Sequence, residues 1–494
     1  MTIIDVQIRK SVKNRLNYLG KMSKYLLKSI EKMSIVCYNM GKGGEEMLQR
    51  KIEKQILNWL EKDTKALLID GARQVGKTSI IRKVLEDAKK HYIEFNLIEQ
   101  SNIVTLFKGI ETEDDLIANL SLLTDKKFVK GETVLFFDEI QEYKEIVTKI
   151  KFLVDAGSFR YIFSGSLLGV ELKNIKSAPV GYLRTLTMYP MDFEEFLQLY
   201  NFTDELKASL KKSFEEKLPV NEALHEKMMQ IFRMYLVVGG MPAAVKKFHE
   251  TKDLEAVFAE HEDIIVQYKK DFTKYESDEK RLYLTRIYDL IPGELNEKNK
   301  RFNFADLQKG LRFERTGEDF LWLEKAGVAM AAYNTTEPIV PLQVNQKSSL
   351  FKFFLSDVGL LTTMYGKATK LKILENNEDL NYGAIYENVA AQELLAHKYK
   401  LFYYNTKKQG EVDLMIEYQG EVLPVEIKSG KTYQRHSALN NLLEMENYEI
   451  KQAFVFNNYN VAAKDKTVYY PIYMLMFVNE NEMIQMPKVE IESF

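Results

Sequence analysis

Residues 71–79, GARQVGKTS, combine two spaced glycines with a lysine–threonine pair. In the pattern G-x-x-x-x-G-K-[ST], the glycines let backbone N–H groups face phosphate oxygens, and the following helix N-terminus adds partial positive charge. Lys77 is expected over the β- and γ-phosphates, and the Thr78 hydroxyl is expected to ligate Mg²⁺. A glycine-bearing turn before a helix is the alternative. The predicted nucleotide-binding residues are Gly71, Ala72, Arg73, Gln74, Val75, Gly76, Lys77, Thr78 and Ser79.

A polar pair follows an apolar run in TVLFFDE, residues 133–139. The four apolar residues predict a buried strand, and Asp138 falls at its carboxyl end, where open α/β sheets place ligands. We predict that Asp138 holds Mg²⁺ directly or through water and that Glu139 is the general base for the attacking water. A solvated acidic turn would explain the pair taken alone, but the loop at 71–79 favours a nucleotide site.

Two serines end the next apolar stretch, RYIFSGS, residues 160–166. Ser164 or Ser166, at this strand tip, could contact the γ-phosphate or the attacking water. A plain serine–glycine turn is an equally good explanation. Arg73 and Arg160 are candidate charge stabilisers. The predicted catalytic residues are Lys77, Glu139 and Ser164.

A second site is predicted near the C-terminus, in GEVDLMIEYQGEVLPVEIKSG, residues 410–430. A two-residue turn at Gln419-Gly420 makes a hairpin in which paired residue numbers are symmetric about the turn. One face is then apolar, with Val412, Leu414 and Ile416 against Ile427, Val425 and Leu423. On the other face Asp413 lies directly across from Glu426, and Lys428 lies two residues further on.

Facing carboxylates with Cβ atoms about 5 Å apart repel each other unless a cation compensates. Mg²⁺ or Mn²⁺ would suit Asp413 and Glu426, and Lys428 would steady a developing negative charge. Glu387, in the helical stretch GAIYENVAAQELLAHK, is a candidate third acid. Metal-dependent phosphodiesterases use such a D-x(n)-E-x-K arrangement. The alternative is a solvated sheet face on which Lys428 neutralises Glu426.

The elements that must position the first site alternate along the chain from Met47 onward. Strand-like stretches (ALLID, HYIEFNL, TVLFFDE, RYIFSGS) are separated by stretches with helical spacing. This alternation predicts a parallel sheet with helices on both faces. Beyond Pro190 helices dominate to about residue 275, and a new α/β segment begins near residue 382.

The composition excludes several classes of protein. A formal net charge of −2 over 494 residues excludes a strongly basic nucleic-acid coat. The single cysteine, Cys37, cannot form an internal disulfide or a cysteine zinc site, which suggests a reducing compartment. We find no apolar run of about 18 residues, as a membrane-spanning helix would need, and no secretory signal pattern. A cytoplasmic protein of about two to four domains is expected.

With these residues in hand, the chain resembles a large bacterial and archaeal family of AAA+-type ATPases. Their C-terminal domain of unknown function looks like the PD-(D/E)XK nuclease fold. The matching stretches are GARQVGKTS, FFDEIQ, FSGSLLG, PVGYLRTLTMYPMDFEEFL, YLVVGGMPAAV, FKFFLSDVGLL, GAIYENVAAQELL and GEVDLMIEYQGEVLPVEIKSG. They run in family order from about Met47 to the 430s. Where relatives often carry Gly-Arg, this chain has Gly181-Tyr182, and its arginine comes at Arg184.

The resemblance implies roles for the residues already singled out. ATP would bind through Lys77 and Thr78, with Mg²⁺ at Asp138, Glu139 as the base and a sensor-like role for Ser164 or Ser166. In the C-terminal domain, Glu387, Asp413 and Glu426, with Lys428, stand where a second Mg²⁺ or Mn²⁺ site would need them. A winged helix is implied around residues 280–335, with a small core of Phe304, Leu307, Leu311, Leu321, Leu323 and Val328.

The expected fold is therefore α/β. A P-loop NTPase parallel sheet with a helical lid is joined to a winged-helix-like module and a C-terminal restriction-endonuclease-like domain. The predicted parts are a basic N-terminal extension (1–46), an AAA+ P-loop ATPase core (47–200), a helical lid (201–275), the winged-helix-like module (276–350) and the PD-(D/E)XK nuclease-like domain (378–480). The extension is either an addition before Met47 or a nucleic-acid-binding arm.

Two functional hypotheses follow. In the first, the chain hydrolyses ATP with Mg²⁺ to switch the winged-helix and nuclease-like modules, with DNA or RNA as the partner. In the second, it is a nucleotide-gated protein-interaction switch with a catalytically inert nuclease-like domain. A protein partner or self-association fits either hypothesis, and no membrane is expected.

Overall fold

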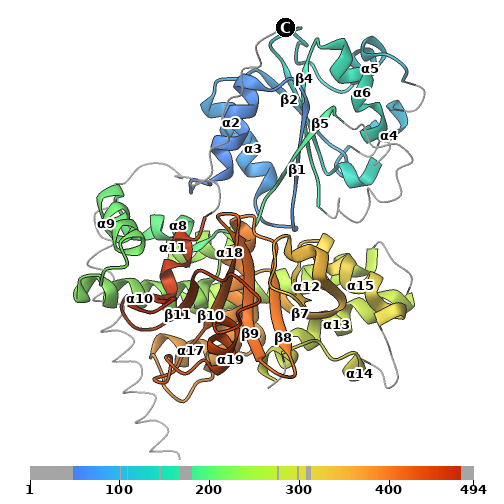
Figure 1. Cartoon of the computed structure of the whole chain (residues 1–494). Coiled ribbons are helices and arrows are strands. Elements are labelled where there is room, and N and C mark those ends of the chain that lie inside the picture. Colours follow the sequence, from blue (N-terminus) through green and yellow to red (C-terminus); the bar gives the residue numbers. More distant parts are fainter. Residues whose placement is uncertain are drawn as a thin grey trace, which may run out of the picture.

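The structure, a computed structural model, describes residues 48–100, 102–107, 110–143, 146–166, 181–274, 278–297, 300–307 and 313–479. The predicted extension 1–46, with Cys37, and the predicted core residue Leu311 lie outside these ranges. The described chain forms an upper lobe and a larger lower lobe, stacked one above the other in Figure 1. The upper lobe runs to the strand that ends at Thr187, and the lower lobe follows it.

Five parallel strands build the upper lobe, in the order β2-β3-β4-β1-β5. Their bounds are β1 (Ala66–Asp70), β2 (Tyr92–Asn96), β3 (Val134–Asp138), β4 (Arg160–Ser164) and β5 (Leu183–Thr187). All five residues of β3 are buried, as an inner strand covered on both faces requires. The predicted parallel α/β sheet is confirmed.

Alternate residues along these strands enter two separate hydrophobic cores. Ile69 and Phe136 belong to one core, and Leu68 and Phe137 belong to the other. Helices α2 (Ile52–Lys62) and α3 (Lys77–Asp87) cover the first face. Helices α4 (Ile103–Leu106), α5 (Glu113–Leu120) and α6 (Ile146–Ala156), with the 3₁₀ turn η1 (Ile140–Tyr143), cover the second face. The strand ends that carry the candidate site are therefore fixed from both sides.

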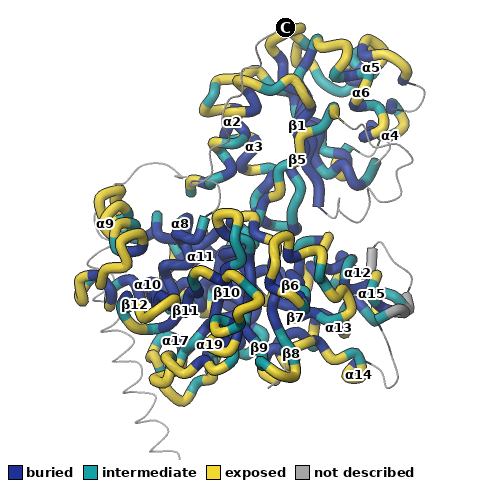
Figure 2. Tube along the Cα trace, in the orientation of Figure 1, coloured by how far each residue is buried: buried dark blue, intermediate teal, exposed yellow. Residues whose placement is uncertain are grey.

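The lower lobe begins with helices. Most residues of one of them, α10, are buried (Figure 2). Its helices are α8 (Phe193–Phe196), α9 (Asp204–Glu215), α10 (Glu222–Val238), α11 (Pro242–Thr251), α12 (Leu254–Lys274), α13 (Asp278–Asn296), α14 (Phe304–Leu307), α15 (Phe313–Lys325), α16 (Val358–Met364), α17 (Lys367–Leu374), α18 (Gly383–Ala396) and α19 (Ser437–Leu443). Its 3₁₀ turns are η3 (Leu197–Tyr200), η4 (Leu342–Asn345) and η5 (Ile472–Phe477). No single helix within the described ranges is long and apolar enough to cross a membrane, although the bent pair α10 and α11 passes by length and composition.

A mixed sheet of eight strands runs through the lower lobe in the order β12-β13-β11-β10-β9-β8-β6-β7. Its strands are β6 (Ala329–Thr335), β7 (Gln346–Leu355), β8 (Phe402–Thr406), β9 (Gly410–Tyr418), β10 (Glu421–Ile427), β11 (Ala453–Asn457), β12 (Ala462–Lys464) and β13 (Thr467–Pro471). β6 pairs with β8 in parallel, so the hairpin β6–β7 extends the C-terminal sheet. The boundary that we predicted between 276–350 and 378–480 therefore cuts through one sheet.

The residues of the predicted winged-helix core have different environments. Leu307, Leu323 and Val328 are buried, Phe304 packs partly buried against the same core, and Leu321 is only half-buried. The core that they join is the large one shared with the upper lobe, which is not the small separate core expected from the sequence. A winged helix at this position stays a prediction.

Two glycine-rich turns meet at a buried aspartate inside the lower lobe. Gly239 ends α10 with φ +69, where glycine is favoured, and a Cβ there would lie 2.3 Å from Asp357 Oδ1. Asp357 Oδ2 accepts the Gly240 N–H at 2.6 Å, and its Oδ1 caps α16 by accepting the Leu360 N–H at 3.1 Å. The stretches VVGGMPAAV and LSDVGLL, far apart in sequence, are thus joined by one carboxylate.

Asp357→Ala is expected to lower the free energy of unfolding by about 3 kcal/mol, because two buried N–H donors lose their acceptor. Urea unfolding followed by Trp322 fluorescence in a Trp59→Phe background measures it, since Trp322 lies in the lower lobe and Trp59 in the upper. Asp357→Asn keeps one side-chain oxygen and should cost less than half as much. Equal losses in the two variants would contradict the account.

Candidate functional site

The phosphate loop joins β1 to α3 at the carboxyl edge of the upper sheet. Gly71 has φ +138, and a Cβ there would lie 2.2 Å from the Met188 carbonyl oxygen, so only glycine fits. Gly76, at φ +93, is the N-cap residue of α3. The Lys77 side chain folds back over the loop, where its Nζ donates to the carbonyl oxygens of Gly71 at 3.0 Å and Ala72 at 2.8 Å.

Lys77 is 8% exposed, and burial lowers the pKa of its ammonium group to about 8, against the opposing effect of Glu139, Asp138 and Asp70. A lysine in this position changes charge at mildly alkaline pH unless an anion stabilises the charged form. Bound phosphates would do so, which links nucleotide affinity to pH.

The affinity for ATP is expected to fall as pH rises above about 8, by up to about tenfold per pH unit. Because the pKa of Lys77 is lowered in the free protein, the free protein loses this proton first as pH rises. The complex with ATP needs the charged ammonium group, so binding becomes weaker. Calorimetric titration from about pH 7 to about pH 9.5 measures the effect. Lys77→Arg stays charged throughout and should give a flat profile. A flat profile for the wild type would contradict the assignment.

Thr78 and Asp138 lie against each other at the mouth of the loop. The Thr78 hydroxyl donates to Asp138 Oδ2 at 2.9 Å, and the Ser164 hydroxyl donates to Asp138 Oδ1. Burial raises the pKa of Asp138, and these two hydrogen bonds oppose the rise. A hydroxyl and a carboxylate are oxygen ligands of the kind that Mg²⁺ takes, so the residues present fit the predicted ion.

Glu139 stands beside this pair in a strained backbone conformation. Its φ is +59, in the left-handed region that few non-glycine residues adopt. The Gln141 side-chain amide donates to Glu139 Oε2 and lies 3.5 Å from the Ser166 hydroxyl. We did not single out Gln141 from the sequence, although it directly follows Glu139-Ile140 in the quoted stretch FFDEIQ. Ser164 thus contacts Asp138, the predicted metal ligand, and Gln141 lies between Ser166 and Glu139, the predicted base.

The two arginines considered as charge stabilisers, Arg73 and Arg160, are engaged elsewhere, and so is Arg184. Arg73 pairs with Asp271 of α12, and Arg184 pairs with Asp63. Arg160 stacks 4.5 Å from the Trp59 ring. Its guanidinium also donates to the carbonyl oxygens of Trp59, Leu60 and Asp63. Arg73 would have to leave Asp271 to reach a phosphate, whereas Arg160 and Arg184 lie near the amino ends of β4 and β5, at the edge of the sheet away from the loop.

The lower lobe braces the phosphate loop directly. Tyr268 of α12 donates its hydroxyl to the Arg73 carbonyl oxygen at 3.0 Å, and the Gln74 amide donates to Gln267. From the other side, the Arg50 guanidinium donates to the Val75 carbonyl oxygen at 3.0 Å. These contacts span long sequence separations and could not be inferred from local spacing.

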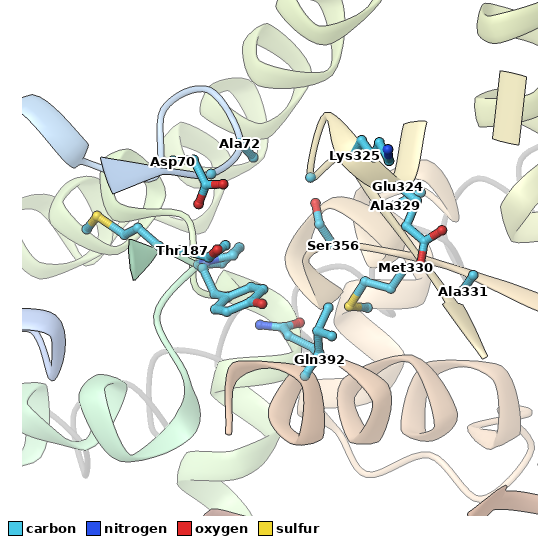
Figure 3. Close-up of a pocket in the computed structure, with 16 residues that line it drawn as sticks. Asp70, Ala72, Thr187, Glu324, Lys325, Ala329, Met330, Ala331, Ser356 and Gln392 are labelled. Carbon is cyan, nitrogen blue, oxygen red and sulfur yellow. The ribbon is translucent and has the colours of Figure 1, made fainter. Parts of the chain in front are cut away.

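A cavity of about 250 Å³ lies in the seam between the loop and the lower lobe (Figure 3). Asp70 and Ala72 lie on one side of it, and Ser356 and Met330 lie on the other. Beside it the turn at Gly327 touches the loop, since a Cβ on Gly327 would lie 2.9 Å from the Ala72 nitrogen. A shift of the loop on nucleotide binding would therefore press on the α15–β6 turn.

The predicted C-terminal hairpin has the expected register. Leu423 pairs with Ile416 and Val425 with Leu414. Continued one pair further, this register puts Glu426 opposite Asp413, and the Asp413 Oδ2 accepts the Ile427 N–H at 2.9 Å. Glu387 reaches the same place from α18. Burial and the facing Asp413 raise the pKa of Glu426 to about 8 in spite of Lys428.

The electrostatics of this cluster differ from the expected three-acid metal site, because lysines lie among the carboxylates. We use the name acid set for Glu387, Glu411, Asp413 and Glu426. Lys428 Nζ lies 2.6 Å from Glu426 Oε1, as the alternative interpretation predicted, but Glu426 is buried and does not lie on a solvated face. Lys352 and Lys300, which the sequence did not reveal, contact the other carboxylates. Within the described ranges, no three His, Cys, Asp or Glu side chains are grouped so as to hold a metal ion.

Comparisons with known proteins agree with the ATPase domain predicted for the first part of the chain. Residues 63–197 match the family model of an AAA domain. Two domains of unknown function match further on, DUF8612 over residues 229–371 and DUF4143 over residues 382–475. No curated protein matches the chain. Residues 63–197 thus form an AAA-like P-loop ATPase domain.

Solved structures resemble the chain only distantly. A Walker-type ATPase of Pyrococcus abyssi has 16% identity and a TM-score of 0.39, over 65% of this chain and 96% of that chain. Cdc6p from Pyrobaculum aerophilum has 14% identity and a TM-score of 0.26, over 68% and 97%. A RuvB variant from Thermotoga maritima has 15% identity and a TM-score of 0.26, over 57% and 88%. TM-scores this low say nothing further about this chain.

Proposed function

We propose that this protein is a Mg²⁺-dependent ATPase that acts as a nucleotide-gated switch between its two lobes. The observation that carries the proposal is the Thr78–Asp138 contact at 2.9 Å, with Lys77 and Glu139 converging on the same loop mouth. Lys77 would hold the β- and γ-phosphates, and Glu139 would orient the water and take its proton as it attacks the γ-phosphorus, with ADP as the leaving group. Mg²⁺, when bound, would neutralise phosphate charge.

The contacts of the loop supply a route from nucleotide to lower lobe. Occupation of the loop requires the Lys77 ammonium to exchange the Gly71 and Ala72 carbonyl oxygens for phosphate oxygens. Gly71 and Ala72 line the cavity between the loop and the lower lobe, and Ala72 touches the Gly327 turn. A ligand shifts a two-state equilibrium only through contacts that differ between the two states. The contacts of Lys77, Gly71 and Ala72 would differ in this way between the empty and the occupied loop.

ATP binding and phosphate release, measured with Mg²⁺ and with EDTA, test the proposal. Lys77→Ala should abolish binding and turnover while keeping the fold. Lys90→Ala, an exposed lysine beyond α3, is the matched control and should behave as the wild type. Turnover of wild-type rate in Lys77→Ala would sink the proposal.

For the C-terminal part we propose an interaction role gated by nucleotide, with no strand cleavage. The lysines among the acid set support this choice over the phosphodiesterase hypothesis. A plasmid and single-strand cleavage assay with Mg²⁺ or Mn²⁺, with and without ATP, distinguishes the two. Cleavage that disappears in Asp413→Ala would establish a nuclease, and its loss in Lys77→Ala would show that ATP controls it. Absence of cleavage with intact ATP turnover supports the switch.

A further inference from the structure

Lys352, in the second half of β7, has a fully buried side chain. The oxygen atoms around its ammonium group stabilise the charged form. Its Nζ lies 2.7 Å from Glu411 Oε1, 3.3 Å from Glu387 Oε2 and 3.2 Å from the Asp413 carbonyl oxygen. A lysine ammonium has three N–H donors, and here three oxygens receive them. The Tyr403 ring, 5.3 Å away, adds a further favourable contact for a cation.

The remaining oxygens of the acid set are also mostly engaged. Lys300 contacts Glu387 Oε1, and the Asn405 amide donates to Glu411 Oε2 at 2.6 Å. Asp413 Oδ2 accepts from the Ile427 N–H at 2.9 Å, and Glu426 Oε1 pairs with Lys428 at 2.6 Å. Four carboxylates thus face three ammonium groups, which leaves a single net negative charge if all are ionised. A divalent cation needs both this charge and the oxygen lone pairs that the ammonium groups occupy.

We propose that Lys352 is the resident cation of the acid set and takes the place that a divalent metal would need. The nuclease-like centre is then an internal ion-pair latch, formed by Lys300 and Lys352 on Glu387, Glu411 and Asp413. This inference stands whether or not the chain hydrolyses ATP.

The latch joins two parts of the chain that match different family models. Lys300 and Lys352 belong to residues 229–371, and the acid set belongs to residues 382–475. Lys300 lies between α13 and α14 and is partly exposed, whereas Lys352 is fully enclosed. A buried ion pair with satisfied donors fixes how two elements sit, because breaking it leaves charges unpaired. The ion pairs of Lys300 and Lys352 therefore fasten the β7 side of the lobe onto α18 and β9.

Binding of Mn²⁺ alone, followed by electron paramagnetic resonance on the full chain, tests the proposal. An Asp138→Asn background removes the metal ligand of the ATP site. In that background little Mn²⁺ binding is expected. Lys352→Gln, which removes one cation from each of Glu387 and Glu411, should raise Mn²⁺ affinity at least about tenfold. Added Asp413→Asn should abolish the gain, and the Tm of Lys352→Gln, but not of its parent, should rise with Mn²⁺.

Two results would overturn the latch. One is Asp413-dependent Mn²⁺ binding in the background that retains Lys352. The other is a folded Lys352→Gln protein that gains no Mn²⁺ affinity. Should Lys352→Gln fail to fold, Mn²⁺ binding to the background that retains Lys352, measured with and without Asp413→Asn, is the deciding comparison. Equally low Mn²⁺ binding in those two proteins would support the latch.

Discussion

Glu139→Gln is expected to lower kcat for ATP hydrolysis by about 10²- to 10⁴-fold while leaving ATP affinity nearly unchanged. The amide keeps the size and the hydrogen-bonding reach of the carboxylate but cannot accept the proton of the attacking water. Lys77, Thr78 and Asp138, which would hold the nucleotide and its Mg²⁺, are untouched. The variant should therefore trap ATP in the loop.

Single-turnover hydrolysis and equilibrium ATP binding, measured on the same preparations, separate the two effects. Glu132→Gln is the matched control, since Glu132 is exposed and lies just before β3, at the edge of the sheet opposite the loop. Its kcat should equal that of the wild type. Turnover that persists in Glu139→Gln would show that another group takes the proton. A variant that neither binds nor hydrolyses would instead point to collapse of the strained turn at φ +59.

The parts of both sites that the sequence predicted are those that local spacing determines. Gly71, Gly76 and Lys77 act within one loop, and Asp138 meets Thr78 because parallel strands end at the same edge of the sheet. The hairpin was predictable for a similar reason. A two-residue turn at Gln419-Gly420 leaves one register that puts all apolar residues on one face.

The contacts that could not be predicted from the sequence join segments that are far apart along the chain. Lys352 reaches Asp413 across 61 positions in the sequence, and Lys300 reaches Glu387 across 87. No periodicity encodes such contacts, so Lys352 looked like any alternating polar residue of a strand. The same limit hid the pairing of β6 with β8, which merged two predicted modules into one sheet. The ion pair of Arg73 with Asp271 was equally invisible, although Arg73 itself was singled out.

Lys352→Met is expected to lower the free energy of unfolding by about 3–5 kcal/mol, the cost of removing one partner from a buried ion pair. Methionine fills nearly the same volume, so the loss would come from charge and not from a cavity. Glu387 would keep only Lys300, and Glu411 would keep only the Asn405 amide. Lys451→Met is the matched control, since Lys451 and its partner Glu421 are 61% and 41% exposed. That exposed pair should contribute less than about 1 kcal/mol.

The dependence of this loss on pH identifies its cause. Without Lys352, burial and mutual repulsion raise the pKa values of the facing carboxyls above those of the unfolded chain. Groups raised in this way destabilise the fold at pH above their folded pKa, and the penalty is relieved as pH falls and they take up protons. Urea unfolding of Lys352→Met, followed by Trp322 fluorescence after Trp59→Phe, should therefore show a larger deficit near pH 8 than near about pH 5. A deficit independent of pH would mean that Lys352 contributes through packing, because only unpaired carboxylates can recover stability by binding protons.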